Sequence, residues 1–130
     1  MKAEVRFHIR DRAAQSALAI GPGKIALLEA IEQTGSITAS AKKLRMSYRR
    51  AWLLVDETNR CLVRPAVRTA TGGQRGGGAS LTPAGIDLIR RYRALERETA
   101  LAVTRRRPLA HRLAPESGVK APVAGAEALA

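Results

Sequence analysis

Clustered lysines and arginines are the side chains of this 130-residue chain best suited to bind a ligand. Residues 36 to 75 contain nine of them, including the pair Arg49 and Arg50, but only two acids, Asp56 and Glu57. Guanidinium groups bind phosphate oxygens and pair in a bidentate manner with guanine. We therefore expect a polyanionic ligand, with nucleic acid as the first candidate and an anionic membrane surface as the second.

The composition of the whole chain supports this expectation and disfavours other classes of protein. There are 23 Lys and Arg against 11 Asp and Glu, a formal net charge of +12. With one cysteine, Cys61, and two distant histidines, the sequence offers no disulfide framework or Cys/His metal site, and we expect no cofactor. No arrangement of nucleophile, base and paired carboxylates indicates an enzyme. Without a signal-peptide core or a run of roughly 20 apolar residues, a cytoplasmic protein with no membrane partner is expected.

Two short helices should position the basic residues. Ser36 can cap a helix through "ITASAKKLR", and Ser47 can cap a second helix that runs to about Leu62. Along the second helix the apolar residues and the arginines fall on opposite sides, so one face would pack and the other would point outward. The side expected to pack consists of Ala51, Leu54, Val55, Thr58 and Leu62. In a helix-turn-helix, the first residues of the second helix reach base edges in the major groove.

A glycine-rich loop follows this pair of helices. "VRPAVRTA" reads as a strand, "TGGQRGGG" as the loop and "ASL" as a return strand, before Thr82 and Pro83 begin a further helix. A hairpin directly after a recognition helix is the layout of a winged helix, whose tip follows the DNA backbone or enters the minor groove. One alternative is a phosphate-binding loop, but the glycine-rich segment does not end in the Gly-Lys-Ser/Thr that such a loop requires. The other is a merely flexible hairpin turn.

These elements define a set of candidate DNA contacts. In the helix-turn-helix the candidates are Ser36, Thr38, Lys42, Lys43, Ser47, Tyr48, Arg49 and Arg50. In the hairpin they are Arg68, Thr71, Gly72, Gly73, Gln74 and Arg75.

The remaining segments complete an α+β domain, a winged helix-turn-helix. Val5, Phe7 and Ile9 alternate with polar residues, which predicts a strand of an N-terminal β-hairpin with its partner near Leu18 and Ile20. A helix from "GPGK" to Gly35 would bury an apolar face of Ile25, Leu27, Leu28 and Ile31. We expect the DNA-binding domain to occupy residues 1–104. Residues 105–130 should form a disordered, basic, Pro/Ala-rich tail.

The long last helix carries apolar or small residues at alternating spacings of three and four. Leu88, Tyr92, Leu95, Thr99 and Ala102 follow this pattern and predict a homodimer seam. The alternative is that the stripe covers the core of its own domain. Trp52 poses a similar choice, between packing at the core boundary and contact with a base or sugar.

A family resemblance rests on the same residues. "GKIALLEAIEQTGSITASAKKLRMSYRRAW" and "TATGGQRGGGASLTPAG", between about Gly21 and Arg90, resemble the N-terminal winged helix-turn-helix domain of ModE-type molybdate-responsive transcription regulators, which is related to that of LysR-type regulators. The resemblance implies a dimer that binds a palindromic operator, with Ser47 to Arg50 in the recognition helix and Gly72 to Gly78 in the wing. It also implies a sequence-specific regulator linked to molybdenum metabolism. The alternative is an architectural, nucleoid-type binder with little sequence preference.

Two departures from the family pattern create further expectations. The molybdate-binding domain of full-length members is expected to be missing, because the chain continues into the Pro/Ala tail. Arg45 stands in the turn between the helices, where the family often has glycine. Since a left-handed backbone there would cost a non-glycine residue roughly 1 kcal/mol, we expect the turn to differ locally.

Overall fold

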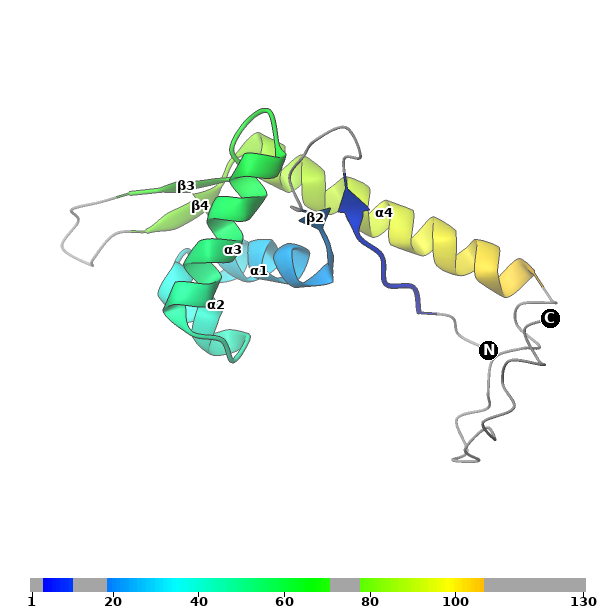
Figure 1. The fold of residues 1–130 in the computed structure, drawn as a ribbon, viewed down its shortest axis with the longest axis horizontal. Helices are drawn as coiled ribbons and strands as arrows, with labels where there is room; N and C mark the ends of the chain where they lie inside the picture. The colour runs from blue at the N-terminus through cyan, green and yellow to red at the C-terminus, as the bar shows by residue number, and fades with distance from the viewer. Residues whose placement is uncertain (1–3, 11–18, 71–77, 107–130) are drawn as a thin grey trace. The chain divides into compact units, whose positions relative to one another are not determined.

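A computed structural model describes residues 4–10, 19–70 and 78–106 (Figure 1). The chain divides into two units: Arg6–Ala94, and a second unit to which the described residues from Leu95 onward belong. Within the described ranges the elements are β1 (Ile9–Arg10), β2 (Ala19–Ile20), α1 (Pro22–Thr34), α2 (Ile37–Lys43), α3 (Tyr48–Cys61), β3 (Val67–Thr69), β4 (Ala79–Leu81) and α4 (Pro83–Arg105). The α+β class and the order of elements expected for a winged helix are confirmed.

The N-terminal hairpin is shorter than the sequence pattern predicts. β1 pairs antiparallel with β2 through Ile9 opposite Ile20 and Arg10 opposite Ala19. Residues 4–8 are described but do not form a strand. Phe7 instead serves the core: its ring stacks on Tyr92 with centroids 4.6 Å apart, and its carbonyl oxygen accepts a 2.7 Å hydrogen bond from the Tyr92 hydroxyl.

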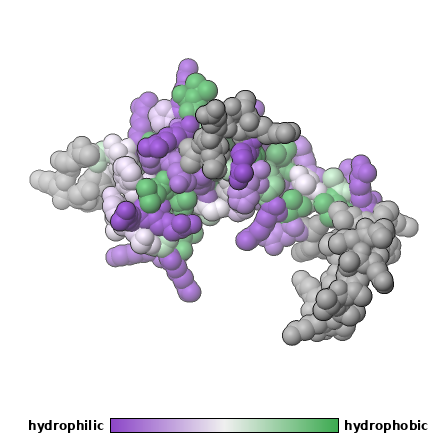
Figure 2. All heavy atoms as spheres, in the orientation of Figure 1, coloured by the Kyte–Doolittle hydropathy of each residue, from purple (hydrophilic) through white to green (hydrophobic). Residues whose placement is uncertain are grey.

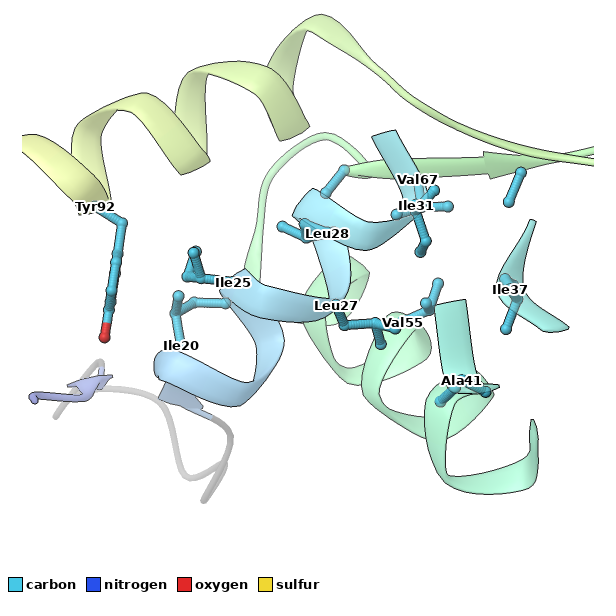
Figure 3. Packing of buried hydrophobic residues seen from close by; sticks show 13 residues of the cluster. Ile20, Ile25, Leu27, Leu28, Ile31, Ile37, Ala41, Val55, Val67 and Tyr92 are labelled. Carbon is cyan, nitrogen blue, oxygen red and sulfur yellow. The ribbon is translucent and has the colours of Figure 1, made fainter. Parts of the chain in front are cut away.

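Helix α1 lies at the centre of the hydrophobic core. It begins at Pro22, whose fixed φ suits the first helical position, and it ends at Thr34, followed by Gly35 with a φ of 69°. The predicted apolar face is confirmed, because Ile25, Leu27, Leu28 and Ile31 are all buried. Figure 3 shows these side chains together with Ile37 and Ala41 of α2, Val55 of α3 and Val67 of β3.

Both predicted serine caps are present. The Ser36 hydroxyl accepts a hydrogen bond from the Ala39 N–H at 3.1 Å, and the Ser47 hydroxyl accepts one from the Arg50 N–H at 3.1 Å. Each cap satisfies a backbone donor that the first turn leaves without a helical partner. The starts of α2 and α3 are therefore determined locally by the sequence.

The turn between α2 and α3 corrects one expectation. Arg45 adopts the left-handed conformation that glycine favours, with a φ of 57°. The Met46 N–H donates to the Ala41 carbonyl at 2.9 Å and the Arg45 N–H to the Lys42 carbonyl at 3.2 Å, the pattern of a Schellman motif. The expected local difference was wrong, because these two hydrogen bonds and the packing of the flanking helices outweigh the strain at Arg45.

Replacing Arg45 with glycine should raise the free energy of unfolding by about 0.5–1 kcal/mol. Relief of about 1–2 kcal/mol of left-handed strain is partly offset by about 0.4–1 kcal/mol from the greater freedom of glycine in the unfolded chain. Urea denaturation should show a higher midpoint with an unchanged slope. Arg45→Ala is the matched control, since it keeps a Cβ atom. An equal gain in both variants would contradict the assignment of strain to this residue.

The second hairpin is joined to both ends of the helix-turn-helix. β3 pairs antiparallel with β4, and the two strands run side by side in Figure 1. At one end, Asn59 of α3 accepts hydrogen bonds from the N–H groups of Ala66 (2.8 Å) and Val67 (3.2 Å). At the other end, the Ala79 N–H donates to the Gly35 carbonyl at 2.9 Å, at the corner between α1 and α2. The strand predicted from Val63 begins only at Val67, the second of the two residues whose N–H groups donate to Asn59.

Helix α4 begins as predicted. The Thr82 hydroxyl caps it by accepting from the Gly85 N–H at 3.1 Å, and Pro83 is its first residue. Tyr92 is buried and Leu88 is half-buried against the core cluster, so this part of the predicted seam packs on the core of its own unit. In the second unit Leu95 and Ala102 are exposed and Thr99 is half-buried. The helix ends at Arg105, and residues 107–130 of the predicted tail lie outside the described residues.

Candidate nucleic-acid interface

The first turn of α3 presents its charged residues outward. Tyr48, Arg49 and Arg50 are exposed, whereas Ala51 and Val55 are buried against the core. The two-sided character predicted for this helix is therefore confirmed. Hydrophilic side chains dominate the visible face of the molecule in Figure 2, with hydrophobic ones between them.

Acidic residues do not neutralise this turn. Across the described ranges, no carboxylate lies within ion-pair distance of Arg49 or Arg50. Asp56 pairs instead with Arg60, at 3.1 Å, one turn along the helix. Two guanidinium groups thus remain open to an anionic ligand.

Glu57 has a role that the sequence did not reveal. It forms a 3.2 Å ion pair with Lys24 of α1, whose ammonium group also donates to the Ala19 carbonyl at 2.5 Å. Lys24 is buried, so this lysine and this acid join α1 to α3 and do not face a ligand. The one sequence signal for this ion pair was a lysine near the start of the apolar helix face. We predicted that face from its apolar residues alone and did not consider the lysine.

Helix α2 adds further basic side chains. Thr38, Lys42 and Lys43 are exposed, and the Lys43 ammonium donates to the Gln33 side-chain oxygen. Ser36 and Ser47 are engaged as caps, but a hydroxyl that accepts a backbone hydrogen bond keeps its own proton to donate. Each helix-turn-helix candidate therefore keeps a group that can donate a hydrogen bond to a ligand.

The hairpin candidates are described only in part. Arg68 is exposed on β3, opposite Ser80. Thr71, Gly72, Gly73, Gln74 and Arg75 lie outside the described residues.

Trp52 does not pack at the core boundary. Its side chain is 47% exposed, and neither Trp52 nor the neighbouring Leu53 belongs to the core cluster or its half-buried margin. Of the two roles considered for Trp52, contact with a ligand is therefore the one that its exposure favours. On the helical wheel Trp52 lies at the edge of the packed side. Whether a side chain at such a position is buried depends on residues from other parts of the chain, which the helical pattern does not contain.

Comparison with known proteins shows which proteins the domain resembles. No model of a known protein family matches the chain. The molybdenum-pterin-binding protein MopB of Rhodobacter capsulatus is 49% identical over 77 residues, which are 59% of this chain and 28% of MopB. The DNA-binding transcriptional dual regulator ModE of Escherichia coli K12 is 39% identical over 92 residues, 71% of this chain and 34% of that protein. Over the matched residues the chain is therefore similar to ModE-type proteins.

The similarity covers only part of each relative. The molybdenum transport protein ModE of Azotobacter vinelandii is 42% identical over 87 residues, 67% of this chain and 32% of that protein. The chain thus spans about a third of the length of these relatives. The resemblance inferred from the motifs of the ModE-type domain is confirmed for this part.

The described residues lack two features of other classes of protein. In the part of the chain that the structure describes, no helix is both long enough and apolar enough to cross a membrane. The same residues contain no group of three or more His, Cys, Asp or Glu side chains placed to hold a metal ion.

Proposed function

We propose that the chain is a sequence-specific, DNA-binding transcription regulator, without enzymatic activity, that acts in the cytoplasm and is linked to molybdenum metabolism. The observation that carries this proposal is the first turn of α3, where Arg49 and Arg50 point outward with no acidic partner among the described residues while the opposite face is buried. The names of the relatives support the same function, because several are called transcriptional regulators or molybdenum proteins.

In this proposal α3 contacts the bases and α2 contacts the phosphates. Ser47, Tyr48, Arg49 and Arg50 enter the major groove, where the arginines pair with guanine edges. The exposed residues of α2, together with Ser36, contact phosphates and set the orientation of the domain on the duplex. Arg68 and residues 71–75 of the hairpin follow the neighbouring backbone.

A homodimer on a palindromic operator is the assembly that we propose. The seam would use Leu95, Thr99 and Ala102. Tyr92, at 1% exposure, contributes by holding α4 to its own unit and is not available to a partner. Two copies related by a two-fold axis would place their recognition helices in successive major grooves.

Residues 105–130 would add phosphate contacts through "RRRP".

An architectural role is the second candidate function. The net charge of +12 favours it, because charge alone supports binding to any duplex. Selection of bound sequences from a random duplex pool, at near-physiological salt, separates the two functions. Recovery of a two-fold symmetric motif supports the dimeric regulator. Tight, salt-sensitive binding without any recovered motif would overturn it in favour of the architectural role.

A further inference from the structure

The outward face of α3 carries two large apolar side chains that the core does not use. Trp52 is 47% exposed and Leu53 is 45% exposed. Leu53 follows Arg49 by four residues and Arg50 by three, so these three side chains lie on one face of the helix. Single exposed apolar residues are common on proteins, but two adjacent ones beside the arginines of the candidate interface require an explanation.

The charges around this pair indicate what covers it. A second copy of the chain docked on the same face would bring Arg49 and Arg50 of both copies together, and like charges in an interface are unfavourable. A DNA duplex instead matches the arginines with phosphates and guanine edges. The apolar group that a major groove offers is the C5-methyl group of thymine, which apolar side chains contact.

We propose that Leu53, with Trp52 beside it, contacts thymine methyl groups in the major groove and so adds a preference for thymine to the guanine contacts of the arginines. This inference rests on the proposed function. Leu53 stands one turn beyond Arg49, a rise of about 6 Å along the helix, whereas bases of one strand are spaced by about 3.4 Å. The thymine read by Leu53 therefore lies within about two base pairs of the base read by Arg49.

Replacement of thymine by deoxyuridine tests the proposal, because it removes only the methyl group. The duplex is the sequence recovered by selection, with each thymine replaced in turn. The wild-type chain should bind about fourfold more weakly at one or two positions near the base pair that Arg49 reads, the change expected from uncovering one methyl-sized group. Leu53→Ala should bind the thymine and deoxyuridine duplexes equally at those positions.

Two further variants serve as controls. Ile86→Ala removes an apolar side chain that is 39% exposed on α4 and should keep the wild-type sensitivity to deoxyuridine. Leu53→Asn keeps the size of the side chain but not its apolar character, and it should lose that sensitivity as Leu53→Ala does.

The outcomes separate this inference from the function on which it rests. If Arg49→Ala relaxes a base preference while deoxyuridine has no effect at any position, or has equal effects on wild type and Leu53→Ala, the contact with methyl groups is overturned and the regulator is not. If the loss of Leu53 changes the oligomeric state and leaves the deoxyuridine sensitivity intact, the face is a protein interface, which also overturns the proposal. If neither arginine nor thymine changes alter sequence preference, the proposed function fails as well.

Discussion

Replacing Gly85 with alanine should destabilise the domain by about 3 kcal/mol, at the upper end of the usual cost of overpacking. An added Cβ atom would lie closer than 3.0 Å to the carbonyl oxygen of Ala66 and 3.1 Å from its carbonyl carbon. The atoms that the Cβ would meet belong to the backbone of Ala66, and hydrogen bonds hold this backbone on both sides. The Ala66 carbonyl accepts a 2.9 Å hydrogen bond from the Thr82 N–H, and the Ala66 N–H donates to Asn59. Neither α4 nor the loop before β3 can move away without breaking one of these bonds.

Urea denaturation of Gly85→Ala and of a matched variant, Gly23→Ala, measures this effect. Gly23 is also helical, in α1, but among the described residues no atom outside its own stretch of helix lies within 4 Å of its added Cβ atom. Alanine there should leave the stability unchanged or raise it by up to about 1 kcal/mol. Equal unfolding midpoints for the two variants would show that α4 does not need its close approach to Ala66.

Replacing Arg49 with alanine should weaken binding to the selected duplex by about 1–3 kcal/mol, roughly 5- to 150-fold, and should relax the preference at one base pair. The reason is the loss of a bidentate contact that other bases cannot satisfy. Titration of the variant against duplexes altered at each position of the motif measures both effects. Arg49→Lys should recover the charge but only part of the preference, because an ammonium group lacks the rigid planar fork of the guanidinium group.

Lys42→Ala provides the contrasting control for this measurement. Lys42 is exposed on α2, and in the proposed complex it contacts phosphate only. Its loss should weaken binding to all duplexes by a similar factor and should lower the slope of log affinity against log salt by about 1. If Arg49→Ala also weakened binding to every duplex equally, the recognition helix would not be reading bases.

The parts of the fold that could be predicted from sequence are those determined by near neighbours. The serine caps of α2 and α3 and the threonine cap of α4 each join residues three apart, so their signal is complete within one turn. Gly35 ends α1 because glycine adopts its φ of 69° without strain. The outward direction of Arg49 and Arg50 followed from the period of α3.

The features missed from sequence depend on contacts between distant segments. Tyr92 is buried because Phe7, 85 positions earlier, supplies both a ring and a carbonyl oxygen. Lys24 is buried because Glu57 approaches from another helix. Arg45 is left-handed because the helices on either side of the turn require it, although its own preference is against that conformation. No local pattern contains these partners.

The ratio of the dissociation constants for a scrambled duplex and for the selected duplex, measured at about 0.15 M salt, tests the central claim most directly. A sequence-specific regulator should bind the selected duplex at least about a thousandfold more tightly. A ratio near one, with strongly salt-dependent binding to both duplexes, would contradict the account and identify a protein that binds DNA through charge alone.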